Sequence, residues 1–363
     1  MKIRMLGRGE EKFWDAYVLK HPKSTLCHLA GWRRVIEHTY GHKSYYLIAE
    51  DEQCNSEIKI VGILPLIHIN SLLFGNTLVS MPFLNYGGLL TDDEKTEILL
   101  LEEARRLGRD LRIKSIELRQ IQPISWTDGQ GAEAVLGAKI PEPMTHKVRM
   151  VLNLPESSAM LFESFKSKLR SQIRKPQKEG LVAFMGGAEL LGEYYHVFSV
   201  NMRDLGSPVH SKKLFENILK EFGESAKLGV VKYNGIATAS GLIFCFRDLV
   251  EIIWASSLRE YNNLSPNMLL YWSFLEYVTD AGYKCFDFGR STPEEGTYRF
   301  KEQWGAKPTS LHWYHIAPSQ RPHAQTTCGD VNQLRQRGEI VWQKTPLFVA
   351  NLIGPMIRKQ IPL

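Results

Sequence analysis

The sequence predicts a mixed α/β fold in which one unit of sheet and helix occurs twice. The chain of 363 residues is too long for one ordinary core, since single domains usually hold about 100 to 200 residues. Strand and helix patterns also recur in the same order in both halves, over nearly equal lengths from Gly62 to Glu117 and from Gly235 to Asp287. Chance recurrence of common α/β patterns is the alternative explanation.

Apolar runs and helical periodicity define the elements of each half. The first half has strand patterns at 45–50, 60–69 and 115–119, with a helix pattern at 94–111. The second half has strand patterns at 227–233, 235–246, 249–257 and 284–289, with a helix pattern at 267–282. That last helix follows Pro266 and ends at Gly282. Ser265 or Asn267 would cap its first turn.

Clustered prolines between residues 141 and 156 predict the domain boundary at about residue 148. We therefore expect an N-terminal domain at 1–148, a C-terminal domain at 149–317 and a tail at 318–363. The tail mixes apolar residues with Lys344, Arg358 and Lys359, and prolines 346 and 355 divide it into short helical pieces. Such pieces either pack on the body of the protein or lie at a membrane surface.

Composition indicates a folded protein, because 44% hydrophobic and 23% charged residues are close to globular averages. The net charge of +6 favours an anionic partner, such as a phosphorylated substrate, RNA or lipid headgroups. Five widely spaced cysteines, no signal peptide and no membrane-spanning run predict a cytoplasmic protein, and peripheral contact with the inner face of the membrane stays open. His312 and His315 fall on opposite faces of a predicted strand, so we expect no metal site.

A basic stripe is predicted on a helix at 161–181, opposite an apolar stripe of phenylalanine, leucine and isoleucine. Lys166, Arg170, Arg174 and Lys178 recur at every fourth residue, so they stack along one edge of the helix. Like charges in that register repel each other unless an anion lies alongside. The alternative is an ordinary solvated helix face.

Residues 201–215 have the composition of a binding loop, because Gly206 and Pro208 fix a turn. That turn would hold Arg203, Asp204 and His210 near one another. A local Arg-Asp ion pair is the alternative.

The stretch FDFGRSTPEEGTYRFKEQWGA, at 286–306, contains the strongest candidate site. Asp287 ends a strand next to Gly289, where a ligand can approach the backbone, and Arg290 and Ser291 follow in the turn. The pattern TYRFKEQWG predicts a returning strand with Tyr298 on one face. Arg299 and Lys301 would share its other face, where they clamp an anion or oxyanion if they face a cleft, or remain edge charges if they face solvent.

This stretch, together with TLVSMPFLNYGG, SKLRSQIRKPQKEGL and RDLGSPVH, resembles the FemAB-like branch of the acyltransferase superfamily, specifically the proteins associated with PEP-CTERM/exosortase systems. The resemblance covers nearly the whole chain and implies two tandem GNAT-like domains. It also implies that Lys301, in FKEQWG, matches the lysine of the family's FK-x-x-[FW]-G segment, which stabilises a charged transition state. Tyr86, in the first motif, joins the substrate-binding candidates.

The resemblance implies an N-acyltransferase that passes an acyl or aminoacyl group to an amine of a cell-envelope or exopolysaccharide precursor. The catalytic candidates are Lys301 and Asp287, and the proton of the amine would leave through Asp287 or water. The substrate-binding candidates are Arg290, Ser291, Arg299, Tyr298, Arg203, Asp204, His210, Arg170, Arg174, Asn267 and Tyr86.

The donor remains open, because the sequence departs from two family patterns. RRLGRD and RDLGSP both miss the last position of the acetyl-CoA pyrophosphate motif, and no long heptad run supplies the arm that some members use for tRNA contact. Aminoacyl-tRNA or acyl-CoA is therefore expected as a co-substrate, with no firmly implied cofactor. The alternatives are acyl-CoA-dependent acylation of a sugar amine, and a non-catalytic protein that binds a phosphorylated glycan precursor.

Overall fold

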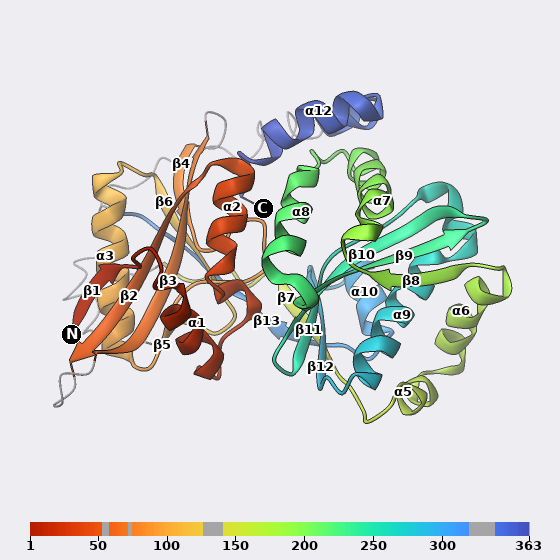
Figure 1. Ribbon diagram of the computed structural model, residues 1–363, viewed down its shortest axis with the longest axis horizontal. Helices are drawn as coiled ribbons and strands as arrows, with labels where there is room; N and C mark the ends of the chain where they lie inside the picture. The colour runs from red at the N-terminus through yellow and green to blue at the C-terminus, as the bar shows by residue number, and fades with distance from the viewer. Residues whose placement is uncertain (53–57, 72–74, 126–140, 319–337, 363) are drawn as a thin grey trace. The chain divides into compact units, whose positions relative to one another are not determined.

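The computed structural model describes residues 1–362 except 53–57, 72–74, 126–140 and 319–337. By internal contacts the chain divides into two compact units (Figure 1). Unit 1 comprises Met1–Val148, Ser310–His323 and Gln360–Leu363, and unit 2 comprises Arg149–Thr309 and Ala324–Lys359.

Unit 1 is built on a mixed sheet in the order β1-β2-β3-β4-β6-β14, with β5 paired to β3. All neighbours are antiparallel except β4 and β6, which are parallel. The strands are β1 (Lys2–Met5), β2 (Lys43–Glu52), β3 (Ile58–Ser71), β4 (Gly75–Val79), β5 (Leu90–Thr91), β6 (Ser115–Gln120) and β14 (His312–Ile316). The helices are α1 (Glu11–Lys20), α2 (Gly31–Tyr40) and α3 (Glu94–Asp110).

Helix α3 shows why these segments fold as they do. Asp93 caps it by accepting a hydrogen bond from the amide nitrogen of Thr96 at 2.8 Å, and acidic residues occupy its first turn. Leu100, Ala104 and Leu107 recur at helical spacing and are buried against the sheet. The core of unit 1 forms on this face.

Unit 2 is built on a second sheet in the order β13-β7-β12-β11-β10-β9-β8. Strands β8 to β11 pair antiparallel, and β11 and β12 pair parallel. The strands are β7 (Val148–Asn153), β8 (Val182–Gly186), β9 (Ala226–Tyr233), β10 (Ile236–Phe246), β11 (Leu249–Ser257), β12 (Cys285–Ser291) and β13 (Lys307–Ser310). The helices are α5 (Ser158–Ser164), α6 (Ser167–Lys178), α7 (Leu191–Asp204), α8 (Lys212–Phe222), α9 (Pro266–Asp280), α10 (Gly296–Glu302) and α12 (Leu347–Arg358).

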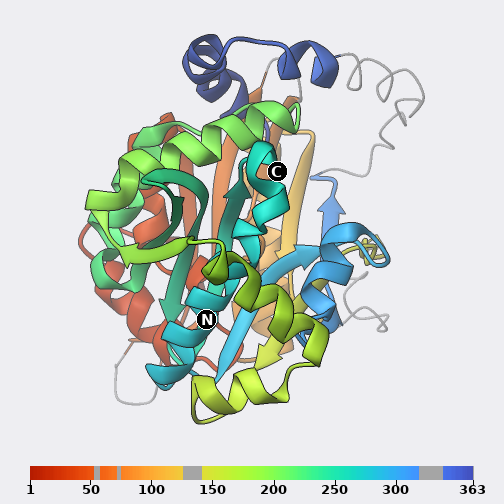
Figure 2. The same ribbon diagram turned by 90° about the vertical axis from the view of Figure 1, so that its right-hand side faces the viewer.

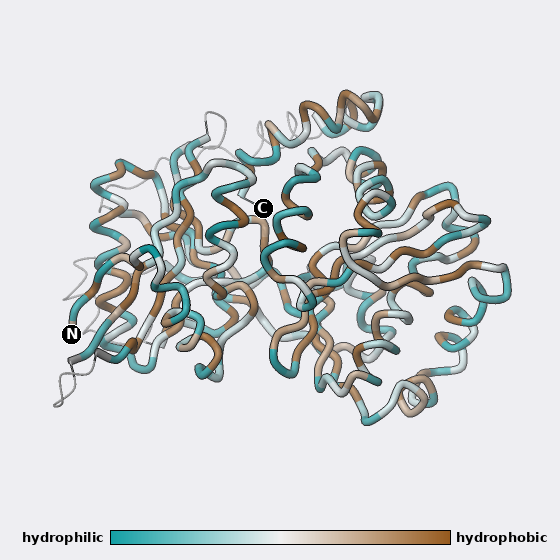
Figure 3. Tube along the Cα trace, viewed as in Figure 1, coloured by the Kyte–Doolittle hydropathy of each residue, from teal (hydrophilic) through white to brown (hydrophobic). Residues whose placement is uncertain are grey.

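Two glycines let α9 approach this sheet closely. Gly229 of β9 and Gly241 of β10 are register partners, and a Cβ atom on either would lie 2.5 Å or 2.8 Å from the ring of Phe274. The absence of a side chain at both positions therefore leaves the space that the ring of Phe274 occupies. On its other side, α9 contacts α5 and α6, which lie beside it in Figure 2. As Figure 3 shows, hydrophobic residues concentrate in the strands.

The predicted mixed α/β fold, used twice, is confirmed: β3-β4-α3-β6 in unit 1 and β10-β11-α9-β12 in unit 2 follow the same order. Two parts of the chain differ from the predicted domain ranges. Strand β14, within 149–317, pairs with β6 of unit 1. In the predicted tail, α12 packs on α7 of unit 2, whereas Gln360 and Pro362 bond within unit 1. None of the helices in the described residues combines the length and apolar content needed to cross a bilayer.

Candidate active site

The candidate site begins where β11 and β12 stop pairing. The two strands pair over three residues, and the last pair joins Glu251 to Asp287. Both carboxylates are buried, at 2% and 0% exposure. Asp287 Oδ1 accepts a hydrogen bond from the amide nitrogen of Gly289 at 2.8 Å, and Gly289 has a φ of 72°. A glycine suits this left-handed turn, which presents the carbonyl of Arg290.

Lys301 donates a hydrogen bond from Nζ to that carbonyl of Arg290 at 2.9 Å. Its side chain is buried, at 8% exposure. The pKa of Lys301 is lowered to about 8, mainly by burial and also by the charge of Arg290, whereas Asp287 and Glu251 oppose this shift. At neutral pH the ammonium is therefore mostly protonated. An ammonium has three donors, and among the described residues Lys301 Nζ makes this one hydrogen bond.

Charged groups of both signs surround Lys301. Asp287 Oδ2 accepts a hydrogen bond from Arg149 Nε at 2.6 Å in a largely buried ion pair. Glu251 is the second carboxylate, while Lys301 and Arg290 add two cations. The site thus brings together Arg149, Arg290 and Lys301 with two buried carboxylates, in surroundings where charges interact more strongly than in water.

Aromatic packing fixes the position of α10, which carries Lys301. The ring of Phe300 lies 4.9 Å from that of Tyr271, and the ring of Trp304 lies 5.6 Å from that of Phe165. Tyr271 belongs to α9, so the C-terminal end of α10 and the turn after it are held by neighbouring segments. Such packing preorganises the ammonium rather than leaving it to solvent.

The predicted strand at TYRFKEQWG is wrong, because residues 296–302 form the helix α10. Phe300 and Trp304 are four residues apart, a helical spacing that outweighs the alternation of polar and apolar residues. Lys301 and Arg299 therefore point to different sides: Lys301 is buried, whereas Arg299 is exposed. The proposed two-residue clamp is not formed, and Tyr298 is half-buried on the same helix.

Ser291, at the end of β12, is a further candidate that the structure buries. Its side chain is 3% exposed, and among the described residues its Oγ has no hydrogen-bond partner. Asn267, in the first turn of α9, likewise has a buried Oδ1 without a partner in the described part of the chain. Buried polar atoms of this kind need a partner, which a substrate can supply.

The predicted helix at 161–181 is two helices, because the backbone is extended at Phe165 and Lys166. On α6, Arg170 is half-buried, and Arg174 is exposed with its guanidinium 5.0 Å from the ring centroid of Phe162. Ile173 is buried on the opposite side of α6, which faces α9. The basic face of α6 thus lies on the outside of unit 2.

The predicted binding loop at 201–215 is also different, since α7 continues to Asp204. Arg203 forms an ion pair with the adjacent Asp204 at 2.7 Å, which is the local pair that the sequence left as the alternative. His210 is buried, and its Nε2 accepts a hydrogen bond from Arg358 Nε at 3.0 Å. Burial is the main cause that holds the pKa of His210 well below its usual value, and the charge of Arg358 adds to it. The role of His210 is therefore structural.

Tyr86 lies in unit 1 and is completely buried. Sequence reasoning missed Glu251 and Arg149, the charges that flank Asp287. The sequence did contain a signal for both residues, because each is the only charge within an apolar strand pattern. A buried charge in such a strand is normally paired with a charge of opposite sign.

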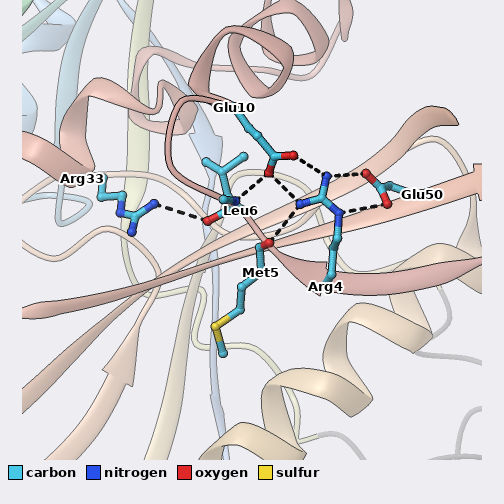
Figure 4. Close-up of polar contacts among 7 residues, drawn as sticks. Arg4, Met5, Leu6, Glu10, Arg33 and Glu50 are labelled. Atoms are coloured by element: carbon cyan, nitrogen blue, oxygen red, sulfur yellow. Dashed lines mark hydrogen bonds and ion pairs between the residues drawn. The ribbon is translucent and has the colours of Figure 1, made fainter.

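Unit 1 has its own polar cluster beside a cavity of about 650 Å³. Arg4 donates hydrogen bonds to Glu10 and Glu50, and Glu10 also accepts one from the amide nitrogen of Gly7 (Figure 4). The hydrogen bond to Glu50, and after it the one to Glu10, raise the pKa of Arg4. The hydrogen bond from Arg4 lowers the pKa of Glu10. Arg4 is the one cation between two carboxylates in this hydrogen-bonded cluster, which stabilises unit 1. Among the described residues, no three His, Cys, Asp or Glu side chains are grouped to hold a metal ion.

Residues 163–302 match the family model described as an acetyltransferase (GNAT) domain, which spans most of unit 2. The chain is 21% identical, over 80% of its length and 87% of the relative's, to a lipid II:glycine glycyltransferase of Staphylococcus haemolyticus. A second glycyltransferase of the same description, from Staphylococcus saprophyticus, is 22% identical over the same shares.

Solved structures show the same fold. The crystal structure of FemX superposes with a TM-score of 0.65 at 16% identity, covering 87% of this chain and 98% of that one. A tandem GNAT protein from the clavulanic acid biosynthesis pathway gives a TM-score of 0.54 at 10% identity, covering 88% and 99%. The matched GNAT domain and the two glycyltransferase relatives support an acyltransferase or aminoacyltransferase activity, and the solved structures show the fold.

Proposed function

We propose that this protein transfers an acyl or aminoacyl group to an amine of a cell-envelope precursor, with Lys301 as the group that stabilises the transition state. The observation that carries the proposal is the buried Lys301 ammonium, which makes one hydrogen bond among the described residues and lies near Asp287 and Arg290. The relatives described as lipid II:glycine glycyltransferases favour a lipid-linked peptidoglycan precursor as the acceptor.

In the proposed reaction the acceptor amine attacks the carbonyl carbon of an ester or thioester. A C–N bond forms, the carbonyl oxygen becomes an oxyanion, and the ammonium of Lys301 stabilises that charge with a donor not used by Arg290. Collapse of the intermediate breaks the bond to the donor, and the released hydroxyl or thiol leaves with a proton. No nucleophilic cysteine or serine is needed, because the amine itself is the nucleophile.

Asp287 acts in this proposal as a positioning residue. Its carboxylate is fixed by Arg149 and by the amide nitrogen of Gly289, and its charge opposes the desolvation of Lys301. Of the two proton routes that the sequence leaves open, this ion pair favours water over Asp287. Arg290 and Ser291 would hold the negative charge of the substrate, and the buried Oδ1 of Asn267 would accept one of its donors.

The donor is an aminoacyl-tRNA or an acyl-CoA. The Fem relatives favour the first, and the match to an acetyltransferase domain favours the second. Both are anions, and the outer face of α6, with Arg170 and Arg174, would recruit either of them. The reaction would take place in the cytoplasm at the inner face of the membrane. The resemblance to PEP-CTERM/exosortase-associated proteins extends the proposed acceptors to an exopolysaccharide precursor.

A transfer assay with the purified full chain tests the proposal. Radiolabelled aminoacyl-tRNA and acyl-CoA are each offered with a lipid-linked muropeptide or with an amino sugar precursor. We expect one donor and acceptor pair to give labelled product with wild-type protein and with Lys307→Met, a change of an exposed lysine in the same unit. Lys301→Met should give almost none. Equal product from Lys301→Met would disprove the assigned role of Lys301.

A further inference from the structure

The described end of unit 2 exposes large apolar side chains in a regular line. Phe348, Leu352 and Met356 of α12 are spaced four residues apart and are 75%, 72% and 62% exposed. They therefore form one stripe along the helix. Exposed apolar stripes of this size on folded proteins mark surfaces that bind a partner or a membrane.

The opposite side of α12 is fixed to unit 2 by small residues. Ala350 and Gly354 are buried, and a Cβ atom on Gly354 would lie 2.9 Å from Cγ1 of Val209. Arg358 holds the end of the helix by its hydrogen bond to His210. An ordinary surface helix buries its large apolar residues, whereas α12 buries Ala350 and Gly354 and exposes its large ones.

The residues before α12 extend the apolar surface. Residues 338–343 are helical, with Ile340 54% and Val341 68% exposed. The carbonyl of Val341 accepts hydrogen bonds from the hydroxyl of Thr345 and the amide nitrogen of Lys344, which close the turn toward α12. The apolar surface is thus continued by a second helical segment.

The charge of this segment selects its partner. From Ile340 to Leu363 the sequence has no acidic residue, and its charged residues are Lys344, Arg358 and Lys359. On the helical wheel Lys359 continues the line of Leu352 and Met356. Glu339 is the one acidic residue of 338–363, so cations outnumber acidic residues there by three to one. Apolar residues bordered mainly by cations are suited to the surface of an anionic bilayer, where the apolar groups enter the acyl boundary and the cations meet lipid headgroups.

We propose that α12 and residues 338–344 bind flat on the surface of an anionic lipid bilayer. A helix of 12 residues is roughly 18 Å long, too short to cross a hydrocarbon core of about 30 Å, so it lies in the interface. This surface is separate from the site around Lys301 and does not depend on the proposed reaction. If the acceptor is lipid-linked, it keeps unit 2 at the membrane that holds the acceptor.

Vesicle flotation of the full-length protein tests the proposal. The vesicles contain phosphatidylcholine alone or mixed with phosphatidylglycerol. We expect wild-type protein and the control Ile236→Glu, which changes an apolar residue 52% exposed in β10, to float with the mixed vesicles. Phe348→Glu/Leu352→Glu should lower the partition coefficient at least tenfold, by rough estimate, because two acyl-facing groups become charged. Lys344→Gln should lower it roughly fivefold on mixed vesicles only.

The proposal is overturned if the double variant floats like wild type, or if wild-type protein binds neither vesicle. Binding to phosphatidylcholine vesicles that equals binding to the mixed vesicles overturns the proposed preference for anionic lipid. A wild-type dimer that the double variant converts to monomer by light scattering would show that a second copy, not lipid, covers the stripe. The proposed reaction is tested apart from this: Lys301→Met should float normally, and the double variant should still acylate a detergent-dispersed acceptor.

Discussion

Two parallel strand pairs, β4/β6 in unit 1 and β11/β12 in unit 2, begin alike and end differently. Each pairs over three residues, and the last residue paired on the second strand is acidic: Glu117 in β6 and Asp287 in β12. Two residues later β6 carries Arg119, whereas β12 carries Gly289. The β4/β6 pair is therefore followed by the long cationic side chain of Arg119, whereas the β11/β12 pair is followed by a glycine.

In unit 1 the guanidinium of Arg119 is completely buried and binds only groups of the protein. It donates to Glu117 Oε1 at 2.7 Å, to the carbonyl of Leu84 at 2.7 Å and to the carbonyl of Pro362 at 2.9 Å. It also stacks on Trp313, 4.7 Å from the ring centroid. Unit 1 thus pairs this cation with its own groups, whereas unit 2 brings in a cation from α10. In the proposed function, the same fold serves stability in one unit and chemistry in the other.

Removing the cation of unit 1 should have the largest effect. Arg119→Met removes the cation that pairs with the buried Glu117 and the donor to the carbonyl of Leu84, so we expect the free energy of unfolding to fall by about 3 to 5 kcal/mol. Urea denaturation measures it. Arg119→Met/Glu117→Gln should recover part of the loss, because no buried charge remains unpaired. A loss below about 1 kcal/mol would show that Arg119 is not the internal partner of these groups.

Removing the cation of unit 2 should instead act on catalysis. Lys301→Met should lower kcat by about 10² to 10³-fold, equivalent to about 3 to 4 kcal/mol, as when one oxyanion donor is lost. Steady-state transfer kinetics measure it. The KM values should change much less than kcat, because the interaction is made mainly in the transition state. A loss confined to KM would make Lys301 a binding residue only.

The same variant should stabilise the fold. The pKa of Lys301 falls to about 8 from a usual value of 10.5, so the unfolded chain binds more protons between these pH values and stability rises with pH across that window. Below pH 8 the buried charge costs up to about 3 kcal/mol. Lys301→Met should therefore unfold at higher urea than wild type at pH 7, and the difference should vanish near pH 10.5. A variant less stable than wild type at pH 7 would reverse this conclusion.

The smallest effect concerns the end of the chain. The carbonyl of Pro362 accepts hydrogen bonds from Arg119 and from the amide nitrogen of Phe83. A chain ending at Lys359 should lose roughly 1 to 2 kcal/mol of stability, since these donors lose a buried acceptor. Pro362→Ala keeps the carbonyl and should stay within about 0.5 kcal/mol of wild type. Thermal unfolding compares the two, and equal stability of all three chains would show that the tail does not complete the cluster.

Strong periodicity made most of the fold predictable. The helix predicted at 267–282 spans Pro266–Asp280, and the strand predicted at 249–257 matches β11. Short elements with mixed signals were less predictable: α10 was expected as a strand, and the break at Phe165 was missed. Both depend on packing against α9, which a local pattern does not reveal.

The candidate site was predictable only in part. Lys301 and Asp287 were found from one stretch of sequence, since both lie close together in it. Glu251 and Arg149 reach Asp287 through strand register and a long-range ion pair, at separations no local motif encodes. The prediction that Arg299 lies on the same side as Lys301 was wrong because it assumed a strand where the chain forms the helix α10.

The central claim is that Lys301 acts as a buried cation, and the pH dependence of kcat tests it most directly. If the ammonium stabilises the oxyanion, kcat should decline as pH rises through about 8, and in Lys301→Arg, whose guanidinium stays charged, the decline should shift to higher pH or disappear. If kcat instead rises through pH 8 and Lys301→Arg abolishes that rise, the neutral amine acts as a base, and the role of Lys301 as a stabilising cation is contradicted.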